Sequence, residues 1–528
     1  MTAMASELLT GIKAYLPEWP IGFASRGIML RHLKKLLPHC YNKLILDMAI
    51  NIAKWRWQLY PWDRETINIL SALSVKSGTS LLTNWAQPLS SQLEHNFFLA
   101  IQAIVSGKAE DVITLWKKFG SDTLEAAWVG ETCLFFLQRG DADTVRMILK
   151  STSLPVHHPV KAHLEALFAF VFEEQETALR TIRCMPDDFR WLRMLLEAQY
   201  LIQSKDTTGI YLLQQLWNEI PWFPNLTLTL HTLLSPGFIP TLAGQDTAVL
   251  IYSWNNAELL KNTLECIARS ELGEASVVLL DNGSTDHTKA VFASFSELFG
   301  LRLKSMQLPV NIGAPAARNW LLRHTDLQPF QTIVYLDDDV IVPPDWLTKL
   351  TSQYRQLPAG SILGCRIMNQ SPQQSLQMAD VNLLDLEQDS DFLIANSGGG
   401  ELDLGLHSYS RPCLSVTGCC HMMDRRHAVD LGGFDLRFSP SQFDDFDLDL
   451  RNALQGGRAV YAGRTAIRHC QRSSLNQADS EAKQGHIQGN MLKLRTKYTR
   501  SQKVDLLHRN RDILWNDLIS KTRDLEQA

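Results

Sequence analysis

The stretch VYLDDDVIV, residues 334–342, decides the fold expected for the second half of the chain. The apolar residues before Asp337 indicate a buried strand, and the apolar pattern resumes after Asp339 until two prolines end it. Three adjacent carboxylates cannot lie inside a core strand, because each costs several kcal/mol to desolvate without a partner. We therefore expect them at the carboxyl end of a strand, where open α/β sheets bind ligands. Carboxylate oxygens suit a divalent cation, and the alternative is a solvated turn without a ligand.

Length and composition set the broad class of protein. A chain of 528 residues predicts two to four domains, and a net charge of −5 gives no indication of a nucleic-acid partner. No apolar run approaches the roughly 18–20 residues of a membrane span, and the first residues do not resemble a secretory signal. The nine cysteines are scattered and include no CxxC pair. Reduced thiols and a cytoplasmic location are the expectation.

Residues 1–240 are predicted to be helical, because apolar residues recur at three- and four-residue steps. From about residue 93 a helix–turn–helix pattern repeats, with turns at Gly140, near Glu174 and near Lys205. The spacing of roughly 30–35 residues is that of tetratricopeptide-type hairpins, which bury their apolar faces by stacking. Two interpretations remain open: the repeats dock an extended protein ligand, or they only support the second domain.

A different pattern begins after the Pro- and Gly-rich segment 234–247. Short apolar strands alternate with helices, which predicts a parallel sheet with right-handed crossovers. The strands are expected at 248–254, 276–286 with a polar, turn-rich end, 301–309 and 332–340, and the helices at 257–270, 286–300 and 311–325. Because the carboxyl ends of parallel strands share one edge, Asp281 and Asp337 are expected on the same rim.

Six segments of this second half resemble the family 2 glycosyltransferases, the inverting GT-A type. In order they are YSWNN, LLDNGSTDHT, NIGAPAARN, YLDDDV, GGFDLRFSPSQFDDFDLDLR and AIRH. The resemblance implies an α/β catalytic domain of the GT-A type, Rossmann-like with a mixed, mostly parallel sheet. We expect three parts: an all-α helical-repeat domain at 1–240, the GT-A domain at 246–475 and a C-terminal helical extension at 476–528.

The acidic triplet receives its roles from this resemblance. Asp339 would bind a metal that bridges the donor diphosphate, and Mn²⁺ and Mg²⁺ both suit an oxygen-rich site. Asp337 would face the ribose and metal-bound water, and His469 would be a further metal or phosphate contact. Asp338 holds the variable middle position; we place it on the donor side as the least important of the three, and its alternative is solvation. For His469 the alternative is a satisfied structural histidine.

The family reads the nucleotide base near Tyr252, Ser253 and Asp281. Asn282 stands where many relatives have a second acid, so UDP- and GDP-linked sugars both remain open. Arg318 matches a basic residue near the nucleotide, and its alternative is a surface ion pair.

The second acidic cluster, residues 442–451, matches the family's catalytic segment. Asp445 would be the general base that deprotonates the acceptor hydroxyl. Asp444 stands where relatives typically have Glu. Asp447 and Asp449 are predicted to be solvated or to favour the helix dipole.

Three further segments carry weaker predictions. Residues 417–423 are expected to form a strand beneath the acceptor pocket, and a zinc site at Cys419, Cys420 and His421 is disfavoured because zinc spacings are absent. Residues 386–403 and 471–486 are polar, and each is either a lid over the donor or a surface loop.

The sequence therefore predicts a metal-dependent inverting glycosyltransferase. It would move a sugar from a nucleotide-diphosphate sugar to an acceptor hydroxyl. The helical repeats would dock a protein acceptor or partner, and a glycan or a lipid-linked acceptor remains open. One alternative is a non-catalytic scaffold with an inert nucleotide-sugar-binding domain. A nucleotidyltransferase is disfavoured, because the first strand lacks a following Gly-rich loop and Arg.

Overall fold

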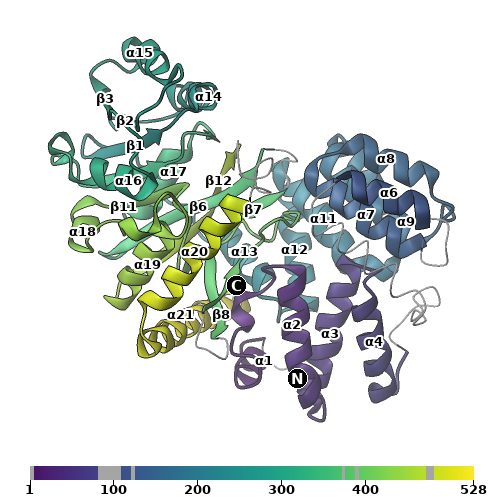
Figure 1. The fold of residues 1–528 in the computed structure, drawn as a ribbon. Coiled ribbons are helices and arrows are strands. Elements are labelled where there is room, and N and C mark those ends of the chain that lie inside the picture. The colour runs from purple at the N-terminus through teal and green to yellow at the C-terminus, as the bar shows by residue number, and fades with distance from the viewer. Residues whose placement is uncertain are drawn as a thin grey trace.

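A computed structural model describes residues 5–80, 109–119, 125–370, 375–386, 392–470 and 481–527. Within these ranges, a helical part and an α/β part lie side by side, and the C-terminal helices lie along both (Figure 1). No described helix combines the length and the hydropathy that a membrane span requires.

The first part of the chain is helical, as predicted. Side-chain caps start its helices: Asn42 accepts a hydrogen bond from the Leu44 amide at the start of α3, and Asp63 accepts one from Thr66 at the start of α4. The helices are α1 (Ala5–Ile12), α2 (Arg26–Leu36), α3 (Lys43–Leu59), α4 (Arg64–Ser77), α6 (Ala109–Phe119), α7 (Glu125–Arg139), α8 (Ala142–Ser151), α9 (Pro159–Phe172), α10 (Gln175–Arg183), α11 (Arg190–Gln203), α12 (Thr208–Glu219) and α13 (Pro224–Leu234).

Three of the predicted hairpins are present. Helices α7 and α8, α9 and α10, and α11 and α12 pack as consecutive pairs. Their connections contain Gly140, Glu174 and Lys205, where the turns were expected. The first predicted hairpin falls largely on residues outside the described ranges. The helical character is thus confirmed, and the tetratricopeptide assignment stays a prediction.

A mixed sheet forms the second part. Its strand order is β10-β12-β6-β11-β4-β1-β2-β3, with β5 on β12 and β7 on β6. The strands are β1 (Thr247–Ser253), β2 (Ser276–Asp281), β3 (Leu303–Gln307), β4 (Thr332–Leu336), β5 (Val340–Ile341), β6 (Ser361–Asn369), β7 (Leu376–Met378), β10 (Ser410–Cys413), β11 (Cys420–Asp424) and β12 (Arg458–His469), with a separate hairpin of β8 (Val381–Leu386) and β9 (Phe392–Asn396). Strands β3, β2, β1 and β4 are parallel, and β11 joins β4 antiparallel. The predicted fold class is confirmed.

The two faces of the sheet bury alternate residues. In β1, Val249 and Ile251 belong to the core under α14 (Ala257–Ala268), α15 (Thr288–Phe299) and α17 (Trp346–Tyr354). Ala248 and Leu250 belong to the other core, which includes residues of α16 (Ala314–Arg323). Because successive side chains point to opposite faces, a strand buried on both sides is apolar throughout.

The C-terminal helices connect the two parts. Helix α21 (Arg500–Gln527) packs against α1 and α13 and also against β8 and β10. Trp515 Nε1 donates to the Pro17 carbonyl at 2.8 Å. Helices α18 (Arg425–Asp430), α19 (Asp444–Leu454) and α20 (Glu481–Lys497) complete the fold, and α20 and α21 are yellow in Figure 1.

Candidate active site

A cavity of about 730 Å³ lies at the ends of β1, β4 and β12 and at the start of α19. Seven predicted site residues line it: Tyr252, Arg318, Asp337, Asp338, Asp339, Asp445 and His469. Ser253 and Asp281 do not line it; both are buried, and they pair with each other in the parallel register of β1 and β2. The structure therefore brings the two acidic clusters of the sequence to one cavity.

The acidic triplet meets His469 at this cavity. His469 Nε2 lies 2.8 Å from Asp339 Oδ1 and 3.7 Å from Asp337 Oδ2. Burial acts to lower the pKa of His469, but the hydrogen bond to Asp339 and the charges of the neighbouring carboxylates outweigh it and raise the pKa. Burial raises the pKa of Asp337. A cluster of carboxylates with an imidazole is typical of a cation site.

The donor atoms fit a divalent cation. Ligand atoms of Asp337, Cys419 and His469 all lie within 4.8 Å of one another, and Asp339 lies beside His469. Burial raises the pKa of the Cys419 thiol well above its ordinary value, which disfavours the thiolate that zinc would select. The remaining set of carboxylates and an imidazole suits Mn²⁺ or Mg²⁺.

A zinc site at Cys419, Cys420 and His421 is not what the structure assembles. The His421 side chain is hydrogen-bonded to Asp449 at 3.0 Å. The Cys420 thiol is hydrogen-bonded to the Cys365 thiol. The segment that carries them forms β11, as predicted.

Asp338 is not the solvated carboxylate that its alternative interpretation described, and its place on the donor side stays a prediction. It is partly buried, and its two oxygens accept hydrogen bonds from Ser253 Oγ and Asn256 Nδ2, the latter at 3.0 Å. Burial and the charge of Asp339 raise its pKa to about 7. The middle residue of the triplet therefore ties the end of β1 to the end of β4.

Arg318 is not in a surface ion pair. It is buried, and its Nη1 donates to Asp444 Oδ2 at 2.6 Å. Its Nη2 lies 3.6 Å from Asp337 Oδ1, and its guanidinium lies 5.5 Å from the centre of the Tyr252 ring. The guanidinium of Arg318 thus links the first acidic cluster to the second.

Asp445 faces the cavity from the first turn of α19. Its Oδ2 accepts from the Gly418 amide at 2.6 Å, and its Oδ1 accepts from the Phe446 amide at 2.8 Å. Both bonds fix the orientation of the carboxylate. Gln442 and Phe443 have φ values of 82° and 69°, so a left-handed turn aims the helix start. A Cβ at Gly418 would lie 2.8 Å from Arg318 Nη2 and 3.1 Å from Asp445 Cβ, so a larger residue would crowd both side chains.

The prediction that Asp447 and Asp449 are solvated or only favour the helix dipole is wrong. Both are buried. Asp447 accepts from Arg451 at 2.9 Å and from Lys497 and Tyr498 of the C-terminal region. Asp449 accepts from Ser415 Oγ, the Val416 amide and His421. These carboxylates fix α19 to its neighbours, and with it the orientation of Asp445.

Asp281 is held by its own turn. Its Oδ1 accepts from the Ser284 amide at 2.8 Å, and its Oδ2 has no hydrogen-bond partner among the described residues. Gly283 has a φ of 78°, and a Cβ there would lie 2.3 Å from the Val310 carbonyl carbon. The role of Asp281 in base recognition stays a prediction.

A match to a known family covers part of the residues that carry this geometry, and Asp445 and His469 lie beyond it. Residues 248–428 match the family described as Glycosyl transferase family 2. These residues form a family 2 glycosyltransferase domain.

Two similar proteins match only part of their length. The chain is 26% identical over 238 residues to the O-antigen biosynthesis protein RfbC of Myxococcus xanthus, which is 44% of this chain and 18% of that protein. It is 32% identical over 122 residues to the validoxylamine A glucosyltransferase of Streptomyces hygroscopicus subsp. jinggangensis, or 22% and 28% of the two chains. The chain thus spans less than a third of either relative.

Solved structures show more distant likenesses. The mannosyltransferase PcManGT of Pyrobaculum calidifontis, in complex with GDP-Man and Mn²⁺, shares 16% identity at a TM-score of 0.38, over 63% of this chain and 85% of that one. A fragment of S. aureus TarS in complex with UDP-GlcNAc shares 17% identity at a TM-score of 0.35, over 49% and 70%.

Sequence reasoning missed several residues that line the cavity of the family 2 domain. Gln377 Oε1 accepts from His469 Nδ1 at 2.7 Å, and Asn396 and Thr417 also reach the cavity. Gln377 lies in a three-residue strand without an acidic or glycine-rich pattern, so the sequence contains no signal for it.

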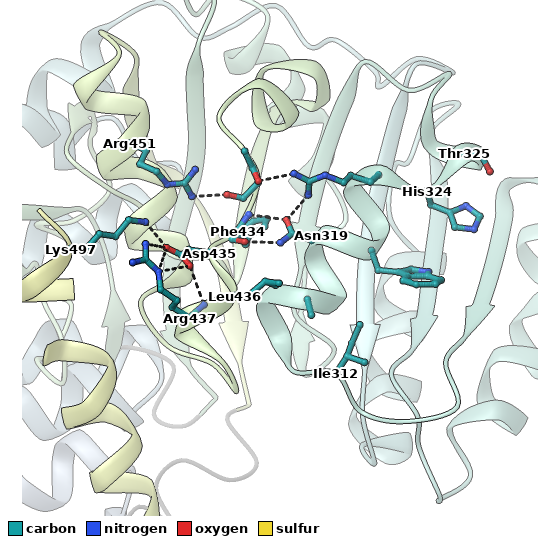
Figure 2. A pocket seen from close by; sticks show the side chains of 15 residues that line it. Ile312, Asn319, His324, Thr325, Phe434, Asp435, Leu436, Arg437, Arg451 and Lys497 are labelled. Atoms are coloured by element: carbon teal, nitrogen blue, oxygen red, sulfur yellow. Dashed lines mark hydrogen bonds and ion pairs between the residues drawn. The ribbon is translucent and has the colours of Figure 1, made fainter. Parts of the chain in front are cut away.

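A second cavity, of about 1,210 Å³, lies against α16 and the segment 432–437 (Figure 2). Its cations are engaged with neighbouring groups. Arg451 donates to the Leu431 and Gly433 carbonyls, and Lys497 and Arg437 pair with Asp435. These bonds hold the segment that leads to Asp445.

Proposed function

We propose that this protein is a metal-dependent inverting glycosyltransferase that uses a nucleotide-diphosphate sugar. The observation that carries the proposal is the 730 Å³ cavity, in which Asp337, Asp339 and His469 share a wall and Asp445 stands at the start of α19. One group of residues suits a cation and a diphosphate, and the other suits a proton transfer.

The donor side follows from the charges. Asp339 and His469 would hold Mn²⁺ or Mg²⁺, and the ion would neutralise charge on the departing nucleoside diphosphate. Asp337 and Tyr252 lie where the ribose and base would be read, with the guanidinium of Arg318 beneath them. Both UDP- and GDP-linked sugars fit this chemistry, and Asp338 positions the triplet rather than binding the donor directly.

The acceptor side rests on Asp445. The acceptor oxygen forms a bond to the anomeric carbon while the bond from that carbon to the diphosphate oxygen breaks, and the hydroxyl proton passes to Asp445. The amides of Gly418 and Phe446 hold the carboxylate in place before the step. Attack opposite to the leaving group inverts the anomeric configuration.

The helical part would bring a protein acceptor to this site in the cytoplasm. The repeated helical hairpins support this proposal, since stacked hairpins present extended surfaces. A glycan acceptor is the second candidate, because the RfbC relative is named for O-antigen biosynthesis.

Calorimetric titration of the full chain with UDP- and GDP-sugars, with and without Mn²⁺, tests the proposal. We expect one nucleotide class to bind, with affinity that depends on Mn²⁺ and on Asp339. Asp445→Asn should bind the donor as the wild type does, while donor hydrolysis or transfer falls by about 10²–10⁴-fold. If neither nucleotide binds and Asp339→Asn changes nothing, the protein is a scaffold with an inert domain.

A further inference from the structure

A segment of the family 2 domain, residues 397–406, lies on the helical part. Leu402 and Leu404 are buried, and they line a small cavity with Leu59 of α3 and Leu134 of α7, among other helical residues. At this place, the surface of the helical part is therefore occupied by the chain itself. Residues 386–403 were predicted to be a lid or a surface loop. The part at 397–403 is not a free surface loop, because the helical part covers it.

The carboxylate of Glu401 anchors this segment. Its Oε1 accepts from the Arg26 amide at 3.0 Å, at the first residue of α2. Its Oε2 accepts from the Tyr60 hydroxyl at 3.1 Å and from Gln138 Nε2 at 3.4 Å. A helix N-terminus favours a carboxylate, because its first amides have no partner within the helix. Groups on three parts of the helical domain thus converge on one side chain.

The backbone beside Glu401 holds β7. The Leu376 amide donates to the Glu401 carbonyl, and the Gly400 amide donates to the Leu376 carbonyl, both at 2.9 Å. The next residue, Gln377, accepts from His469 Nδ1 at 2.7 Å. His469 Nε2 then lies 2.8 Å from Asp339. A continuous series of hydrogen bonds runs from the helical part to the candidate metal site.

Gln377 determines which ring nitrogen of His469 faces the cavity. An acceptor at Nδ1 keeps a proton on that nitrogen, so Nε2, which here lies 2.8 Å from Asp339 Oδ1, is the nitrogen that would ligate a cation after losing its own proton. The orientation of the imidazole depends on where β7 places Gln377, and β7 is fixed by Glu401.

We propose that the helical domain sets the geometry of the metal side of the donor cavity, with Glu401 and Gln377 as positioning residues for His469. The inference rests on the proposed donor site and gives the helical domain a role beyond acceptor docking. It also predicts that a partner seated near Tyr60 and α2 would alter donor binding.

Three variants of the full chain test the series of contacts from Glu401 through Gln377 to His469. Glu401→Ala removes the anchor, Tyr60→Phe removes one donor to it with little change of shape, and Gln377→Leu removes the acceptor at Nδ1. Gln377→Glu keeps an acceptor at that position and should retain most of the Mn²⁺ binding that Gln377→Leu loses. Asn225→Ala is the matched control: Asn225 is buried and bridges Phe23 and Leu406 in the same interface, but it has no bond to β7.

Hydrogen exchange without metal gives the first measurement. We expect amides of residues 375–378 to exchange about tenfold faster in Glu401→Ala, less so in Tyr60→Phe, and unchanged in Asn225→Ala. Equal acceleration in Asn225→Ala, or none in Glu401→Ala, would overturn the proposal, because β7 would then not be held through Glu401.

The second measurement is of Mn²⁺ binding, followed by the EPR signal of the free ion. We expect Gln377→Leu to weaken binding by about 10–100-fold, as loss of a hydrogen bond behind a metal ligand does, and Gln377→Glu to recover most of it. Weakening by Gln377→Leu without recovery in Gln377→Glu would mean a packing effect and would overturn the role of the acceptor. If the wild type binds neither Mn²⁺ nor nucleotide, the proposed function fails, whereas the exchange experiment still decides whether Glu401 holds β7.

Discussion

Replacing Arg318 by Met should be among the most damaging substitutions in the active site. Arg318 is the cation between Asp444, at 2.6 Å, and Asp337, at 3.6 Å, and the side chains of Arg318 and Asp444 are only 7% and 3% exposed. Breaking a buried pair by removing one partner costs about 3–5 kcal/mol, because a buried charge is left uncompensated. Arg318→Met leaves the charges of Asp444 and Asp337 uncompensated. We therefore expect the free energy of unfolding to fall by about 4–5 kcal/mol, near the upper end of that range.

A double-mutant cycle isolates the pair. Asp444→Leu in the Arg318→Met background should restore about 2–3 kcal/mol, since contacting residues couple by up to that amount. Urea denaturation followed by fluorescence measures each variant. Arg190→Met is the control; Arg190 pairs with Glu219 on the surface, and its loss should cost less than about 1 kcal/mol.

The pH dependence of stability tests the same pair, and its direction follows from the pKa of Asp444. Burial raises the pKa of Asp444 even with Arg318 present, and removing the arginine should raise it further. The folded variant would then bind more protons than the unfolded chain, so the variant should gain stability relative to the wild type as the pH falls from 7 to 5. Additive losses within about 0.5 kcal/mol, or no difference in pH dependence, would refute this account of the pair.

Three further predictions address other parts of the chain. Burial lowers the pKa of His32 and His163 to about 3, so the unfolded state binds protons first, and each histidine should cost about 1.4 kcal/mol of stability between pH 7.5 and 5.5, measured by denaturation at each pH. Asn490→Ala frees the carbonyls of Phe438 and Ser441, which Asn490 Nδ2 holds at 2.9 and 2.8 Å, and should lower kcat while donor affinity stays unchanged. Chelation of divalent ions should abolish nucleotide binding measured by calorimetry, and Mn²⁺ should restore it.

The strands and the two acidic clusters could be predicted because their signals are local. The apolar run before Asp337 is a core strand in the structure, and the carboxylates after it cannot be buried in its interior. Parallel strands then place their carboxyl ends on one edge, which brought Tyr252 and Asp337 to one cavity. Asp445 followed from the family resemblance, and the structure places it at the same cavity.

The partners of buried charges could not be predicted, because they come from distant segments. Asp447 is bound by Lys497 and Tyr498, about fifty residues further on, at the end of α20 and just after it, and the sequence does not specify how this part packs. Seen alone, a carboxylate in the first turn of a helix is as consistent with solvent as with an ion pair. Gln377 was missed for a related reason: its role depends on the register of a short strand, which carries no pattern of its own.

The helical part and the family 2 domain share one hydrophobic core, which extends from Ala5 to Leu518 and includes Leu404 and residues of the sheet. A deletion at the Pro- and Gly-rich segment 234–247 would therefore not release an independent catalytic domain. It would uncover Leu402 and Leu404 and remove the Pro17 carbonyl that Trp515 bonds to. Lost transfer in such a truncation would report a damaged core and not a missing acceptor site. Only point substitutions at the interface, such as those at Glu401 and Asn225, can separate positioning of the active site from docking of an acceptor, because they leave the shared core in place.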